Sequence, residues 1–227
     1  MNDPFDVRAL AGSALALRTL TLPSEGMTAA IGEPEHDSLV YVGRGAGLLS
    51  TRDDSAPVAT RSAGFVPAGS EAQLSATDEL EAIVATVGAG ADLHAPIGPA
   101  ELVTSLDDTD AETATSARSF QILFGPHNGS TRATLFAGFI PPGKAAWHYH
   151  LYDEIVWVPE GPGRLHLEGG TEKLAPGTAF RLRPRQVHIV ENAGDGEMTI
   201  IGIFTPAGSP SAAYLTADVA AEYRIAG

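Results

Sequence analysis

The chain has 227 residues and a formal charge of −14, because 28 Asp and Glu residues outnumber 14 Lys and Arg residues. An acidic surface repels phosphate backbones and anionic lipid headgroups, so nucleic acid and membranes are excluded as expected partners. The absence of cysteine excludes disulfides, thiolate nucleophiles and cysteine-bound zinc.

Hydrophobic residues make up 44% of the sequence and charged residues 19%, which is typical of a folded protein. The 25 glycines and 16 prolines lie between short runs of Val, Ile, Leu, Thr and Phe, a pattern that predicts strands joined by tight turns. The N-terminus lacks the basic and apolar regions of a signal peptide, and no run reaches the about 18 apolar residues of a membrane span. We therefore expect a cytoplasmic protein.

Three segments of the first half recur in the second half at one offset. Residues 37–47, 64–72 and 83–87 align with residues 153–163, 180–188 and 199–203. The first alignment pairs Asp37 with Asp153, Gly45 with Gly161 and Gly47 with Gly163, always 116 positions apart. One offset that holds across three segments predicts a duplicated domain.

A polar, acidic stretch separates the two halves. Residues 105–115 are rich in Asp, Thr and Ala and show no periodicity, as expected of a linker or surface loop. We therefore predict an N-terminal domain over residues 1–95, a linker over 96–116 and a C-terminal domain over 117–227.

Two kinds of element are predicted in the second half besides the repeated strands. Residues 119–124 and 131–140 read as a hairpin around Asn128-Gly129, since Asn-Gly is a strong turn signal. The Ala-rich segment from about Ser211 to Arg224 carries Leu215, Val219 and Tyr223 at a spacing of four, which predicts a short amphipathic helix.

Four side chains of the second half form a candidate metal site. His148 and His150 are two residues apart on an expected strand, so both leave the same face. Glu154 begins the next strand, and His188 lies near a later turn. Three imidazoles and one carboxylate suit one divalent transition metal, whether Fe, Mn, Ni, Co, Cu or Zn, and leave positions open for a substrate.

The spacing of these residues resembles the two motifs of the cupin superfamily. The first motif, G-x5-H-x-H-x3,4-E-x6-G, is similar to Gly143-x4-His148-x-His150-x3-Glu154-x6-Gly161, one residue shorter after the first glycine. The second motif, G-x5-P-x-G-x2-H-x3-N, is similar to Gly177-x5-Arg183-x4-His188-x3-Asn192. Arg183 and Arg185 replace the usual proline and inner glycine of that second motif.

The resemblance covers most of the chain and implies a bicupin. The expected fold is all-β, with two tandem cupin (jelly-roll β-barrel) domains and the short C-terminal helix. The metal is expected in the second barrel alone, because the ligand positions of the first barrel hold Gly32, Pro34, Ser38 and Ala72. Exposed strand edges of such barrels are commonly covered by a partner, so we also expect a homodimer.

The other polar and aromatic candidates are assigned structural roles. His36, His94, His127 and His166 are each isolated and are expected on the surface or in packing contacts. Tyr152 and Asp153 are expected to shape the turn before Glu154. The basic cluster of Arg181, Arg183 and Arg185 is expected to form ion pairs rather than bind an anionic ligand.

Three functions are compatible with this site. The first is a metal-dependent dioxygenase acting on a small organic substrate, an oxidoreductase in which Glu154 also serves as a catalytic base. The second is a redox-neutral sugar isomerase, epimerase or lyase, in which the metal is a Lewis acid. The third is a cupin that binds a small molecule without catalysis.

Overall fold

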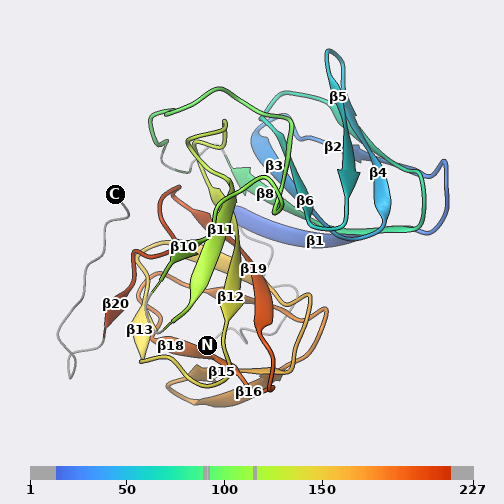
Figure 1. Cartoon of the computed structure of the whole chain (residues 1–227). Coiled ribbons are helices and arrows are strands. Elements are labelled where there is room, and N and C mark those ends of the chain that lie inside the picture. The colour runs from blue at the N-terminus through green and yellow to red at the C-terminus, as the bar shows by residue number, and fades with distance from the viewer. Residues whose placement is uncertain (1–13, 89–90, 92, 115–116, 216–227) are drawn as a thin grey trace.

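The computed structural model describes residues 14–88, 91, 93–114 and 117–215, and every regular element in them is a β-strand (Figure 1). The expected all-β class is therefore confirmed. None of these residues forms a helix with the length and hydropathy that crossing a bilayer requires.

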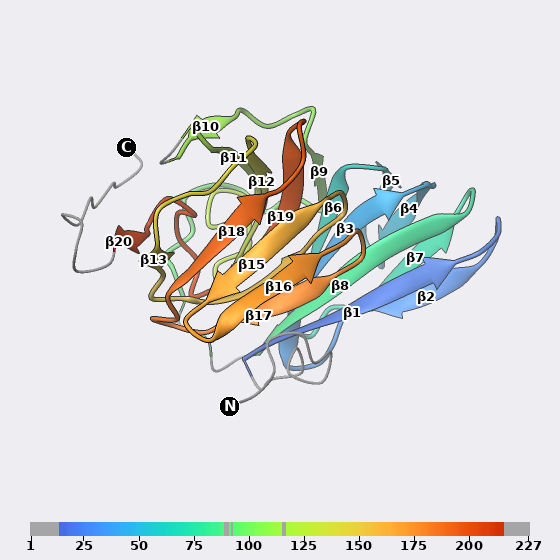
Figure 2. The same cartoon turned by 90° about the horizontal axis from the view of Figure 1, so that it is seen from below.

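The first barrel consists of two antiparallel sheets (Figure 2). One sheet has the order β1-β8-β3-β6-β9, formed by β1 (Leu15–Leu22), β8 (Leu80–Gly88), β3 (His36–Arg44), β6 (Ser62–Val66) and β9 (Val103–Ser105). The other has the order β2-β7-β4-β5, formed by β2 (Thr28–Ile31), β7 (Ala72–Ala76), β4 (Ala46–Thr51) and β5 (Ser55–Ala59).

The second barrel repeats this plan with two further sheets. One has the order β10-β11-β12-β19-β14-β17, formed by β10 (Glu112–Thr113), β11 (Ser119–Phe124), β12 (Thr134–Ile140), β19 (Met198–Thr205), β14 (Asp153–Trp157) and β17 (Ala179–Leu182). The other has the order β16-β15-β18-β13-β20, formed by β16 (Gly170–Leu174), β15 (Gly163–Leu167), β18 (His188–Asn192), β13 (His148–Tyr149) and β20 (Tyr214–Leu215).

The pairing pattern of the first barrel recurs in the second. Strand β3 lies between β8 and β6, and β14 lies between β19 and β17. Strand β4 pairs with β5 and β7, and β15 pairs with β16 and β18. The strands that correspond are those that the offset in sequence aligns, so the two barrels share one topology.

Alternating side chains of the central strands form two separate cores. On β3, Val40 and Val42 point into the first barrel, whereas Leu39 and Tyr41 point outward. The outward residues pack against outward residues of the second barrel, among them Ile155. The two barrels therefore meet through a shared apolar layer between their larger sheets.

The segment predicted as a linker contributes strands to both barrels. Strand β9 pairs with β6 of the first barrel, and β10 pairs with β11 of the second. The exact domain boundaries stay a prediction.

The C-terminal helix expected from about Ser211 is not formed by residues 211–215, the last that the structure describes. Residues 211–215 end in β20, which pairs with β13, and the ring of Tyr214 stacks on Tyr149 with centroids 5.4 Å apart. This strand pairing competes with the helical pattern and prevails there, because it satisfies the edge of β13. Residues 216–224 of the predicted helix lie outside the described residues.

Candidate metal centre

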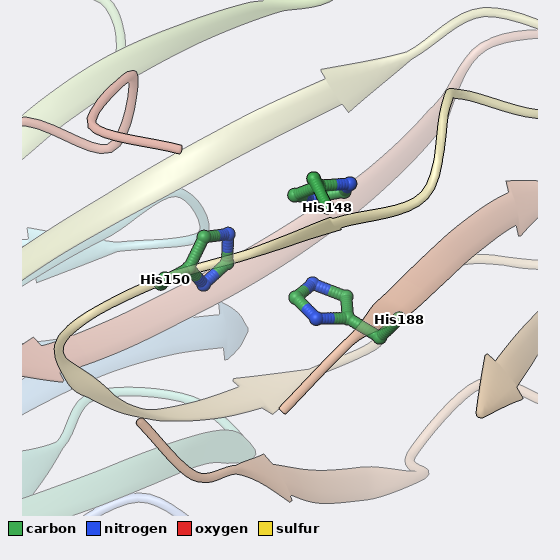
Figure 3. Close-up of side chains that lie close together, drawn as sticks. All are labelled: His148, His150 and His188. Carbon is green, nitrogen blue, oxygen red and sulfur yellow. The ribbon is translucent and has the colours of Figure 1, made fainter. Parts of the chain in front are cut away.

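Three histidines converge inside the second barrel (Figure 3). His148 lies on β13, and His150 follows two residues later, so both side chains leave the same face of the chain. His188 begins β18, and its Cα is the direct partner of the His148 Cα in the antiparallel pair. Strand pairing, rather than a flexible loop, thus brings the two distant histidines together.

The three imidazoles are close enough to share one ion. One ring nitrogen from each lies within 4.8 Å of the others. Their ring centroids are 4.4 Å (His148–His188), 4.8 Å (His150–His188) and 5.2 Å (His148–His150) apart. In the part of the chain that the structure describes, this is the one group of three or more ligand-type side chains so close together.

Backbone carbonyls orient two of the rings. The Nδ1–H of His148 donates to the Ala146 carbonyl at 2.9 Å, and the Nδ1–H of His188 donates to the Gln186 carbonyl at 2.9 Å. These bonds place the proton on Nδ1 and leave the lone pair of Nε2 available for a metal.

Burial keeps these two rings neutral. It lowers the pKa of His148 to about 4, with a further contribution from the neighbouring His150. The pKa of His188 is lowered well below its usual value, again mainly by burial and then by the charges of His150 and His148. A neutral imidazole is the form that donates to a metal.

Glu154 approaches the histidines from the opposite sheet. Its strand, β14, lies between β17 and β19, and the carboxylate points into the barrel with only 2% of the residue exposed. Its Oε2 lies 3.1 Å from Nδ1 of His150, yet has no aligned hydrogen-bond partner. The carboxylate thus lies beside the three-histidine group rather than within it.

These residues fit a divalent transition metal. Two imidazoles present free Nε2 lone pairs, and a third lies next to a buried carboxylate oxygen without a hydrogen-bond donor. Burying an unpaired carboxylate is costly, and a cation at this point would remove that cost. The mixed nitrogen and oxygen donors suit the metals expected from the sequence, without selecting one of them.

A cavity of about 460 Å³ opens onto the histidines, within the usual size range of ligand pockets. Apolar residues of β11, β12, β14 and β19 line part of it, including Phe120, Phe136, Phe139, Val156 and Ile200. Pro210, Ser211 and Ala213 form part of the wall near the C-terminus. The cavity therefore admits a small organic molecule to the candidate metal position.

Tyr152 takes a larger part in this site than the sequence indicated. It lines the cavity, is 7% exposed, and stacks on His150 with ring centroids 4.5 Å apart. On its other side it packs against Phe204, and its hydroxyl donates to the Pro210 carbonyl at 3.4 Å. Tyr152 therefore fixes the orientation of the His150 ring in addition to shaping the turn.

The turn before His188 carries Arg185 where the cupin motif has its inner glycine. Arg185 has a φ of 66°, the left-handed conformation for which the motif uses glycine. Its backbone N–H donates to the His150 carbonyl at 2.6 Å. The turn that precedes His188 is thus tied directly to the backbone of His150.

Except for Tyr152, the residues that were assigned structural roles do not line the cavity. On the outer side of the barrel, the Nε2–H of His166 donates to the Glu191 carboxylate at 2.6 Å, and its Nδ1 accepts from the Thr171 hydroxyl at 2.8 Å. Arg181 forms an ion pair with Asp153 through two hydrogen bonds, as expected of that member of the basic cluster. Neither group contributes to the metal centre.

The corresponding interior of the first barrel is apolar. Val40, Val42, Leu49, Leu74 and Val84 fill it. The positions aligned with the ligands hold Gly32, Pro34, Ser38 and Ala72, and none of these side chains resembles an imidazole or carboxylate. Among the described residues, the first barrel contains no cluster that could hold a metal ion.

Comparison with known proteins agrees with this architecture. The family model of the cupin domain matches residues 137–204. A structure of Bacillus subtilis oxalate decarboxylase, studied for its Mn(II) centres, has a TM-score of 0.71 at 13% identity and covers 87% of this chain and 70% of that chain. No significant match is found among curated protein sequences.

Two smaller proteins are also similar in structure. AerE from Microcystis aeruginosa has a TM-score of 0.70 at 12% identity, covering 85% of this chain and 88% of that chain. A cupin 2 conserved barrel domain protein from Leptotrichia buccalis has a TM-score of 0.61 at 13% identity, covering 86% and 85%. The segment 137–204 is therefore a cupin domain, and the chain as a whole has the fold of two tandem cupin barrels.

Proposed function

We propose that this protein is a metal-dependent enzyme that acts on a small organic substrate, with dioxygen-dependent cleavage as its reaction. The observation that carries the proposal is the arrangement of His148, His150 and His188 at an apolar cavity, with the Glu154 carboxylate beside them. A purely structural metal is usually enclosed by its ligands, whereas a cavity at the ligands leaves room for a substrate.

Each part of the site has a distinct task in this proposal. The three imidazoles and Glu154 hold the metal, which supplies Lewis acidity and, if redox-active, one-electron chemistry. The phenylalanines of the wall exclude water and position the substrate. Glu154 can accept a proton from the substrate at its Oε2, which has no hydrogen-bond donor of its own.

A redox-neutral lyase is the second candidate function. One observation supports it: similar structures include a decarboxylase that contains Mn(II). In that case the same residues hold a Lewis acid that stabilises negative charge developing on the substrate, and no dioxygen is consumed.

Metal replacement separates the two candidates. The protein is stripped of metal, reloaded with Fe(II), Mn(II) or Zn(II), and assayed for oxygen uptake and substrate loss with small phenolic, dicarbonyl and carboxylic compounds. A dioxygenase consumes oxygen with Fe(II) or Mn(II) and is inactive with Zn(II), which has no accessible redox state. Substrate loss without oxygen, including with Zn(II), would instead support the lyase. The matched control is His188→Ala, which removes one imidazole and is expected to abolish either activity.

A further inference from the structure

Among the described residues, one arginine lines the metal cavity. Arg118 directly precedes β11, and its side chain is only partly exposed. Its Nη2 donates to the carbonyl of Val190, which lies on β18 two residues after His188. Both Val190 and His188 also line the cavity, so this hydrogen bond holds the guanidinium on the wall that carries a metal-binding histidine.

Within the described residues, Arg118 lacks the carboxylate partner that five other arginines have. Among the described residues, none places a carboxylate within ion-pair distance of it, whereas carboxylates pair with Arg44, Arg61, Arg132, Arg164 and Arg181. Burial lowers the pKa of Arg118 to about 10, so the group still carries its charge at neutral pH. A partly desolvated cation without a counter-ion is unfavourable, so its position at a cavity points to a ligand that supplies the negative charge.

Arg118 is not suited to bind the metal itself. A guanidinium carries only N–H donors and no free lone pair, so it cannot coordinate a cation. Its planar set of N–H donors matches the two oxygens of a carboxylate, and one backbone carbonyl accounts for only part of that set.

The remaining wall defines the rest of the ligand. Phe120, Phe136, Phe139 and Ile140 present apolar surface to the cavity. These four side chains suit a carbon skeleton and offer no hydrogen bonds. A ligand that matches both Arg118 and this apolar surface thus carries an anionic end and an apolar body.

We propose that Arg118 binds the carboxylate of an organic acid, and that the substrate of the metal centre is a small monocarboxylate with an apolar body. The proposal rests on the function proposed above, because it names the substrate class of the same cavity. Arg118 is then a specificity-determining residue: it orients the acid through paired N–H···O bonds, so that the carbon skeleton lies against the phenylalanines near the metal.

Binding measurements on matched acids and amides test the proposal without requiring turnover. The Zn(II)-loaded full chain is titrated by calorimetry with phenylacetate and 3-phenylpropionate, and with the corresponding amides. The intact protein is expected to bind each acid roughly 10-fold or more tightly than its amide, the effect of a hydrogen bond to a charged group. Arg118→Gln is expected to lose this preference. Arg118→Lys keeps the charge without the planar pair of N–H donors and is expected to retain part of the preference.

The control is Arg183→Gln, an exposed arginine outside the cavity, which should leave acid binding unchanged. Metal content and thermal unfolding of each variant are measured alongside. Equal affinity for acid and amide, absence of acid binding, or unchanged acid binding in metal-loaded Arg118→Gln would each overturn the proposal. Loss of metal or of the fold in both Arg118 variants would show a structural role and overturn it as well. Arginine-dependent acid binding by a protein that turns over no substrate would keep the acid site and overturn only the enzymatic function.

Discussion

At the scale of single residues, Glu154 can hold the metal, move a proton, or do both. Replacing Glu154 with Gln preserves the shape and one potential oxygen donor while removing the charge and the base. If the carboxylate moves a proton, the metal-saturated Glu154→Gln variant stays slow by roughly 10²–10⁴-fold. The test measures the metal affinity of the variant and, separately, its turnover at saturating metal. Full activity of the metal-saturated variant would assign Glu154 to metal binding alone.

The buried histidines set the pH at which metal is released. An exposed imidazole protonates at about pH 6.5 and then no longer donates its lone pair. Because burial lowers the pKa of His148 to about 4 and that of His188 in the same direction, protons compete with the metal only in more acidic solution. We expect the metal content to stay constant from pH 8 to about 6 and to fall toward pH 4, as measured after dialysis at each pH. Half-release near pH 6.5 would contradict this.

At the scale of elements, the sequence predicted the parts that depend on short-range spacing and on the repeat. The spacing of His148 and His150 placed both rings on one face, and the expected hairpin of residues 119–124 and 131–140 is formed by β11 and β12. Asn128-Gly129 does not form a two-residue turn. Instead, the Asn128 side chain is buried and holds a longer loop through Gly125 and Leu123.

The rest of the site could not be predicted because it depends on strand register across the barrel. Nothing in the local sequence around Arg118 or Phe136 indicates that they line one cavity with His188, since Arg118 precedes β11, Phe136 lies on β12 and His188 begins β18. Tyr152 was assigned to a turn, and only the packing of Phe204 behind it shows that it supports His150. The C-terminal segment illustrates the same limit, because pairing with β13 gives Tyr214 an extended conformation despite the helical spacing nearby.

Strand β19 carries a glycine, Gly202, that lies against the Glu154 carboxylate. A Cβ at Gly202 would lie 2.2 Å from Cε1 of Phe136 and 2.8 Å from Oε1 of Glu154, closer than real contacts allow. Gly202→Ala should therefore displace the Glu154 carboxylate and reduce metal affinity roughly 10-fold or more. Competition with a chelator measures this. Gly196→Ala, where a Cβ meets nothing within 4 Å, is the matched control and should bind metal normally.

At the scale of the whole molecule, the shared apolar layer couples the stabilities of the two barrels. Phe65 of the first barrel packs on Phe124 of the second with ring centroids 5.8 Å apart, and Asp37 pairs with Arg132 across the same boundary at 2.9 Å. Phe124→Ala should therefore cost about 3–5 kcal/mol and lower the stability of both halves in a single transition. Thermal unfolding followed by tryptophan fluorescence and by circular dichroism tests this. Two separate transitions, with only one shifted, would indicate independent barrels.

The homodimer stays a prediction that analytical ultracentrifugation of the full chain can check.

Divergence of the two barrels predicts the metal stoichiometry of the chain. In the second barrel the inward positions of β13, β14 and β18 carry His148, Glu154 and His188, whereas in the first barrel Ser38 and Ala72 stand at the positions of the latter two. Apolar side chains pack the interior of the first barrel. A metal ion there would lose its water ligands without gaining protein ligands in their place. We therefore expect one divalent metal per chain by elemental analysis, and none in His188→Ala. A second ion bound with equal affinity, and retained in His188→Ala, would show that the first barrel has a site of its own.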